Sequence, residues 1–180
     1  MRLLHWHCFR DIVRIDSGII VPQLPGTGAI DKKQDDTEGT LKEDMMSLYN
    51  SSELCDMVIK TSTSSFPAHT LVLSARSPVF RAMFSNDMME KTKRVVEITD
   101  LEDEIVRRLL SFMYTDTLDD LCWENASQLF SAADKYQITA LRNECSVLLK
   151  DKLSHANACQ ILILADTHQD ESLKRLCKLI

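Results

Sequence analysis

The stretch LCDMVIKTSTSSFPAHTLVLSARSPVFRAMFSNDMMEKTKRVVEITDLEDEIVRRLLSFMYTD, residues 54–116, decides the fold. It contains two short strand candidates, 55–61 and 65–69, which share the polar turn TSTSS between them. A third candidate, 93–99, contains the β-branched residues that favour strands. Short strands separated by helical segments predict a small sheet with helices between its strands.

Helical patterns occupy the rest of this stretch. Segments 69–77 and 77–85 are compact and helical, and Ser77 with Pro78 suits the N-cap and first position of the second helix. A longer helix is expected over 100–115. Its acidic residues come first and its arginines later, which is the order that the helix dipole favours.

Outside this stretch, helices dominate in both directions. Before it, Leu41, Met45 and Leu48 recur at i, i+4 and i+7 and predict one apolar stripe on a short helix. After it, Ser154 is the expected N-cap of a late helix. Apolar stripes in the C-terminal half are Ala126, Leu129, Phe130 and Ala133; Ile138, Leu141, Cys145, Leu148 and Leu149; Ala158, Ile161, Leu162 and Ala165; and Leu173, Leu176, Cys177 and Ile180. The predicted fold class is therefore α+β, dominated by helices, with a helical C-terminal extension.

Glycine and proline usage marks the domain boundary. The segment VPQLPGTGAIDKKQDDTEGT, 21–40, is typical of a flexible polar linker, and every glycine of the chain lies in or before it. We therefore expect an arm and linker over 1–39, a folded domain over 40–150 and a helical extension over 151–180. Because the last apolar stripe runs up to Ile180, we also expect the natural chain to continue.

Composition and charge exclude several functional classes. The 180 residues are 44% hydrophobic and 27% charged, as in ordinary globular proteins. A formal net charge of -6 argues against non-specific nucleic-acid binding, and no apolar run reaches the ~18 residues that span a bilayer. The six cysteines form no CxxC pair, and four fall at apolar helical positions. This pattern favours reduced, buried thiols inside a cell, in the nucleus or the cytoplasm.

The sequence contains no pattern typical of catalysis. The HWHC segment, 5–8, lacks partner ligands for a metal ion, and no glycine-rich phosphate loop follows a strand. His69 is expected to be a structural or capping residue, and His168 to lie at a solvated helix end. Asp119 and Asp120 fall in an irregular link and are expected in a turn. The chain is therefore predicted not to be an enzyme and to hold no cofactor or metal.

Several motifs at fixed positions in the chain carry a resemblance to one family. They are Cys-Asp before the first strand, FxAH before the first helical pair, LxARSxVFxAMF, VxIxD and FxYT. Together they strongly resemble a BTB/POZ domain. The segment ASQLFSAADKYQITALRNEC is similar to the closing helical pair of that family, and NACQILILADTHQDESLKRLCKLI resembles the helices after the domain in speckle-type POZ adaptors. The resemblance covers roughly residues 41–180 and points to the MATH-BTB, or TD-POZ, subfamily.

The resemblance implies a homodimer formed through the first helix. The stripe of Leu41, Met45 and Leu48 would then pack on a second copy, with Val72 completing the patch. The alternative is that the stripe only covers its own domain. Asp56 and Arg76 match a charged pair that the family buries, and we expect them to pair or to lie partly exposed as structural residues.

The resemblance also implies binding to a cullin scaffold of ubiquitin ligases. The signature of these adaptors is a hydrophobic residue, any residue and a glutamate, which here is Met88-Met89-Glu90. An exposed methionine can fill a groove on the partner while the carboxylate fixes orientation. The alternative is that Met88 packs under Phe84 as ordinary core. The C-terminal helices led by Ile161 and Leu162 would buttress this face.

These implications predict a protein-interaction adaptor that brings substrate proteins to a ubiquitin ligase for degradation. In the subfamily a MATH domain captures the substrate, and the residues before Thr40 are too few for such a domain of over ~100 residues. Two alternatives therefore stay open. One is a dimerisation or co-repressor scaffold that does not bind a cullin, and the other is a truncated competitor of full-length MATH-BTB adaptors.

Overall fold

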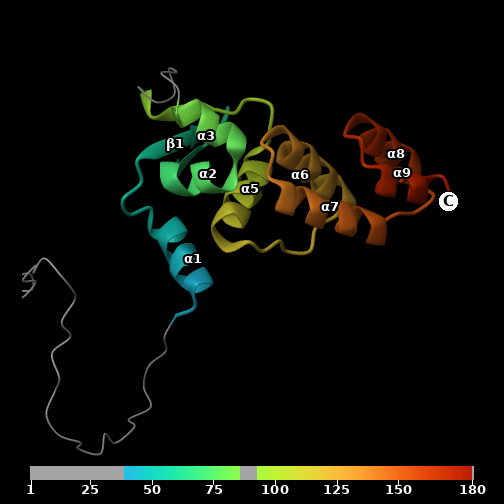
Figure 1. Ribbon diagram of the computed structural model, residues 1–180, viewed down its shortest axis with the longest axis horizontal. Coiled ribbons are helices and arrows are strands. Elements are labelled where there is room, and N and C mark those ends of the chain that lie inside the picture. The colour runs from blue at the N-terminus through green and yellow to red at the C-terminus, as the bar shows by residue number, and fades with distance from the viewer. Residues whose placement is uncertain (1–38, 86–92, 180) are drawn as a thin grey trace, which may run out of the picture. The chain divides into compact units, whose positions relative to one another are not determined.

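A small sheet lies at the N-terminal side of the domain. The computed structural model describes residues 39–85 and 93–179 (Figure 1). Within these residues, the three strands of the sheet lie in the order β2-β1-β3. β1 (Met57–Lys60) pairs antiparallel with β2 (Ser65–Ala68) and parallel with β3 (Val95–Glu97). The three strands predicted from the sequence are therefore confirmed.

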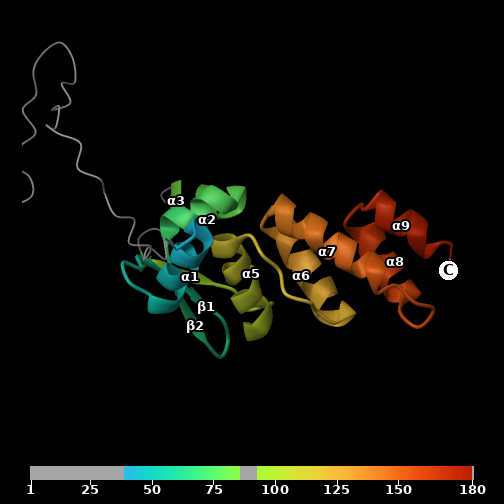
Figure 2. The same ribbon diagram turned by 90° about the horizontal axis from the view of Figure 1, so that it is seen from below.

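The remaining elements are helical. They are α1 (Leu41–Ser51), α2 (Thr70–Arg76), α3 (Pro78–Ser85), α5 (Asp103–Thr115), α6 (Trp123–Lys135), α7 (Thr139–Asp151), α8 (Ala158–Thr167) and α9 (Glu171–Cys177). α2 and α3 lie beside the sheet, α6 and α7 form a pair beyond α5, and α8 with α9 forms a hairpin at the C-terminal end (Figures 1 and 2). The predicted α+β class is confirmed.

α5 lies at the centre of the core. Leu109 and Phe112 on this helix are fully buried, as is Ile59 of β1. α5 packs against α1 on one side and against α2 and α6 on others. Because one helix contacts so many elements, side chains at its two ends are held in fixed positions relative to the sheet and the other helices.

Helix caps explain where several elements begin. Thr40 and Glu43 form a reciprocal capping box at the start of α1. The Ser77 hydroxyl accepts a hydrogen bond from Phe80 N at 3.2 Å, which confirms it as the cap of α3. The predicted cap at Ser154 is wrong. Asn157 is the N-cap residue of α8, and its side chain holds the preceding turn by accepting from Ser154 N at 2.8 Å.

The cysteines are less uniformly buried than the sequence predicted. Cys145 and Cys177 are buried and Cys55 is half-buried, whereas Cys122 and Cys159 are exposed. The prediction of buried thiols is therefore wrong for these last two. Cys122 is the N-cap residue of α6, and Cys159 lies on the face of α8 that turns away from the core. Burial and the neighbouring Glu144 carboxylate raise the pKa of the Cys145 thiol to about 12, so this thiol stays protonated.

Candidate protein-interaction surface

An apolar groove lies where α1, α2 and the end of α5 meet. It has a volume of about 540 Å³. The lining residues are Leu41, Lys42 and Met45 from α1; Leu71, Val72, Ala75 and Arg76 from α2; and Met113, Tyr114, Thr115 and Asp116 at the end of α5. Leu41 and Leu71 are 78% and 81% exposed, so two large apolar side chains face solvent at one groove. Such a patch on a surface is typical of an interaction site.

The position of α1 leaves these leucines uncovered. α1 packs on α5 through its C-terminal half, where the rings of Tyr49 and Tyr114 lie 5.0 Å apart, while Leu41 stands at the other end of the helix. On α2, Val72 is 9% exposed and belongs to the core, whereas Leu71 points away from it. The groove floor is therefore fixed by core packing and its edges are apolar and open.

A buried polar network supports the groove from behind. His69, the N-cap residue of α2, has its Nδ1 2.7 Å from the Tyr114 hydroxyl and its Nε2 2.7 Å from the Glu53 carbonyl. Because a carbonyl can only accept, Nε2 donates to Glu53, and Nδ1 then accepts from the tyrosine hydroxyl. The same hydroxyl accepts from His69 N at 3.0 Å. Burial raises the pKa of Tyr114 to about 12, which keeps the donating proton in place.

This network explains His69 as a structural residue. Its two ring nitrogens are both used to join the segment after α1 to the end of α5. The side chain is buried, and its ring also packs edge-on against Tyr114 with centroids 5.7 Å apart. The expectation of a structural histidine at the junction of strand and helix is therefore confirmed.

An ion pair borders the groove. Arg76 donates to Oδ1 of Asp116, and its guanidinium also lies over the Phe112 ring, 5.6 Å from the centroid. Asp116 caps the end of α5 in the left-handed conformation, with φ 55°, which aspartate adopts more readily than most residues. Arg76 and Asp56 therefore do not pair with each other, and of the two expectations for them, pairing or partial exposure, the structure fits the second. Asp56 is exposed and accepts instead from Thr70 N at 2.7 Å, at the start of α2.

The structure brings together most of the residues predicted for a dimer surface. Leu41, Met45 and Val72 all line the groove. Leu48 is half-buried and is not among the lining residues. Sequence reasoning missed Leu71, although Leu71 and Ala75 share one helix face at i and i+4 and could have indicated it. The role of this surface in pairing stays a prediction.

The predicted cullin-binding residues Met88, Met89 and Glu90 lie outside the described residues. The preceding helix, α3, is described to Ser85, and its Phe84 is buried with 8% exposure. The two readings of Met88, as an exposed anchor or as core under Phe84, therefore both stay predictions.

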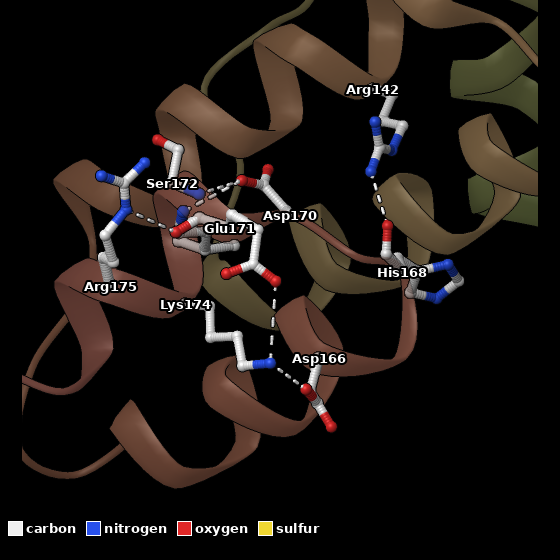
Figure 3. Close-up of polar contacts among 9 residues, drawn as sticks. Arg142, Asp166, His168, Asp170, Glu171, Ser172, Lys174 and Arg175 are labelled. Carbon is white, nitrogen blue, oxygen red and sulfur yellow. Dashed lines mark hydrogen bonds and ion pairs between the residues drawn. The ribbon is translucent and has the colours of Figure 1, made fainter.

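Polar contacts hold the C-terminal hairpin against the domain (Figure 3). Both oxygens of Asp134 on α6 are used: Oδ1 lies 3.0 Å from Nε of Arg142, and Oδ2 lies 2.8 Å from Nδ1 of His168. Arg142 also donates to the His168 carbonyl at 2.7 Å. His168 packs edge-on against Phe130, so the expectation of a solvated helix end is wrong. The reason is that the turn after α8 folds back onto α6.

The hairpin itself is fixed by its connecting turn. Asp170 caps α9 by accepting from Ser172 N and Leu173 N, and it also accepts from the Ser146 hydroxyl of α7 at 2.6 Å. Lys174 bridges the two helices of the hairpin through Asp166, as Figure 3 shows. Apolar side chains complete the contact, and Ile161, Ala165 and Leu173 are fully buried. The hairpin is therefore part of the folded unit.

Within residues 39–85 and 93–179, no group of three or more His, Cys, Asp or Glu side chains is arranged to hold a metal ion. In the same part of the chain, no helix is long and apolar enough to cross a membrane.

Comparison with known proteins identifies relatives of the sequence and of the fold. A family model described as the BTB/POZ domain matches residues 45–153. TD and POZ domain-containing protein 5 of Mus musculus is 38% identical over 140 residues, which cover 77% of this chain and 41% of that protein. The chain thus matches less than half the length of this relative. The structure resembles the BTB domain of zebrafish PATZ1 with a TM-score of 0.51 and 24% identity, over 65% of this chain and 99% of the other, and this likeness supports the fold alone.

Proposed function

The chain belongs to the BTB/POZ domain family, and we propose that it is an adaptor that pairs with a second copy of itself through the groove. BTB domains are protein-interaction domains and typically dimerise. The single observation that carries the proposal is the open apolar surface at Leu41 and Leu71. Covering each of these leucines would contribute about 1.5–3 kcal/mol, and a two-fold contact covers both twice.

The core supports a contact of this kind. The groove floor is built by Val72 and Met113, which are buried and belong to the core, so it need not rearrange when a partner binds. The floor is also braced by the Tyr114–His69 network. A preformed apolar surface loses little conformational entropy on association, and this favours a stable pair over a transient one.

Size-exclusion chromatography with light scattering tests the pairing. Wild-type protein should have the mass of a dimer, and the double variant Leu41→Asp, Leu71→Asp should have the mass of a monomer, because four carboxylates would enter one apolar contact. Val147→Asp is the matched control, since Val147 is 55% exposed on α7 and lies outside the groove. A double variant that kept the dimer mass would contradict the proposed surface.

We further propose that the adaptor binds a cullin scaffold through Met88 and Glu90 and thereby presents substrate proteins to a ubiquitin ligase. Three observations support this: the hydrophobic-x-glutamate pattern, its position between α3 and β3, and a relative of the TD and POZ type. The C-terminal hairpin is held against α6 and α7 by hydrogen bonds. A partner that contacts the domain could therefore also rest on the hairpin.

Capture of a purified cullin N-terminal region by the immobilised chain tests this second proposal. Met88→Asp with Glu90→Lys should abolish capture, and light scattering on the same variant checks that its dimer mass stays unchanged. Val147→Asp with Glu144→Lys makes the same two kinds of change on α7 and should bind normally. If wild-type protein dimerises but captures no cullin, the chain is a dimerisation scaffold without a cullin link.

A further inference from the structure

Two residues of opposite charge, Lys42 and Asp116, line the groove. Lys42 stands in the first turn of α1 and is exposed. Asp116 stands at the end of α5, with 63% of its side chain exposed. A partner that fills this apolar groove therefore also meets the Lys42 ammonium and the Asp116 carboxylate, which Arg76 pairs through one oxygen.

The charges next to these two residues have partners within the chain. Glu43 is bound in the capping box with Thr40, where its carboxylate accepts from Thr40 N at 2.7 Å. Arg76 is bound to Oδ1 of Asp116. The second oxygen of Asp116 accepts no hydrogen bond from the residues that the structure describes, and with the ammonium of Lys42 it is left to meet a partner.

Two-fold symmetry brings these groups together. In a contact between identical surfaces, residue i of one copy meets residue j of the other, and j meets i. A two-fold axis that passes between Lys42 and Asp116 places each of these residues opposite the other residue of the second copy. We propose that Lys42 of each copy faces Asp116 of the other, so that two equivalent ion pairs close the rim and select a partner with the same two charges. This inference rests on the proposed pairing through the groove.

The ion pairs act on the choice of partner more than on affinity. Exposed pairs contribute little net binding energy, because water and salt screen them. Like charges placed face to face, in contrast, oppose association and exclude the wrong partner. A chain of similar fold with a different charge at either position would share the apolar groove and still be rejected. The apolar floor thus provides most of the affinity, and the charges of Lys42 and Asp116 determine which partner is accepted.

Reversing the charge of Lys42 and of Asp116 in separate variants tests the inference. Lys42→Glu alone and Asp116→Lys alone should each weaken self-association at least about tenfold, because each creates two like-charged contacts. An equal mixture of the two variants should form heterodimers, since each copy then meets an opposite charge at both positions. Differently tagged copies, mixed and captured through one tag, measure this preference. The combined variant with both reversals in one chain should dimerise more tightly than Asp116→Lys alone, because the like-charged contacts become opposite-charged ones.

The outcomes separate the inference from the proposed function. A monomeric wild-type protein would overturn the pairing itself. A dimeric wild type whose single reversals pair as tightly as wild type, while remaining folded by circular dichroism, would overturn the charge pairing alone. Should Asp116→Lys fail to fold at its left-handed position, Lys42→Glu against Lys42→Met decides the question on the exposed surface of α1. The charge pairing requires the glutamate variant to dimerise more weakly, and equal affinities would contradict it.

Discussion

The two ends of α5 differ in what their side chains contact. At the first turn, the Asp103 carboxylate accepts hydrogen bonds from three hydroxyls of the β1–β2 turn: Thr61 at 2.5 Å, Thr63 at 2.8 Å and Ser64. At the last turn, Tyr114 and Asp116 face an apolar groove that the described part of the chain leaves open. One end is completed by polar groups from the same chain, and the other presents a surface that a second molecule can complete.

The comparison shows how one rigid helix separates stability from interaction. Contacts at the Asp103 end join α5 to the β1–β2 turn through hydrogen bonds within the chain. The Tyr114 end is different, because only the back of the groove contributes to the fold. We therefore expect substitutions behind the groove to affect folding, and substitutions on its open edge to affect only association. Three measurements of unfolding test this division, from the largest expected change to the smallest.

The largest loss in the free energy of unfolding is expected for Tyr114→Phe. Removing the hydroxyl leaves His69 Nδ1 and His69 N without their partner, and a buried unpaired polar group costs about 1–3 kcal/mol. Urea unfolding at equilibrium measures this loss. Tyr49→Phe is the matched control, because the Tyr49 hydroxyl makes no hydrogen bond to a described residue and the ring stays in place. Equal stability of the two variants would show that the network does not brace the groove.

A smaller loss in the free energy of unfolding, which depends on pH, is expected for Asp103→Asn. Hydrogen bonds from Ser64, Thr61 and Thr63 lower the pKa of this carboxyl below its usual value of 3.8. The folded state therefore favours the carboxylate, and its contribution is present above pH 3.8 and is lost as the pH falls through the lowered pKa. Unfolding followed from pH 7 to pH 2 should show a shallower acid decline in the variant than in wild type. Parallel profiles would mean that the carboxylate contributes no stability.

The smallest change in the free energy of unfolding is expected for Leu71→Asp. Both this variant and its control, Val147→Asp, are measured as monomers. Leu71 is 81% exposed, so its replacement removes almost no core contact, and the free energy of unfolding should change by less than about 0.5 kcal/mol. Protein diluted below its dimerisation range isolates this effect from association. A loss of several kcal/mol would place Leu71 in the core and make the groove a structural feature.

Much of the fold could be predicted because local patterns and tertiary packing agree. The three predicted strands are present, as are the apolar helical stripes within the residues that the structure describes, and Ser77 caps α3 as expected. The error at His168 falls where the outcome depends on a distant residue, because His168 folds back onto Asp134 across 34 positions of sequence and this contact leaves no local signal. The error at the start of α8 is local, since the N-cap residue is Asn157, three positions after Ser154.

The candidate site was only partly accessible to sequence reasoning for the same reason. The stripe of α1 indicated Leu41 and Met45, but a groove needs a second wall, and Leu71 belongs to a helix whose buried face was the stronger signal. The partner of Arg76 was also beyond reach. Asp116 lies 40 positions away and is brought to Arg76 only by the packing of α2 on α5.

The topology of the sheet also has a consequence for the order of folding. β1 and β2 are neighbours in sequence and form a hairpin, whereas Val58 of β1 pairs with Val95 of β3 across a crossover that contains α2 and α3. Closing the long connection costs more entropy than closing the short one, so the hairpin can form first and β3 must enter late. We therefore expect truncation of Val96 to speed unfolding while leaving the folding rate nearly unchanged.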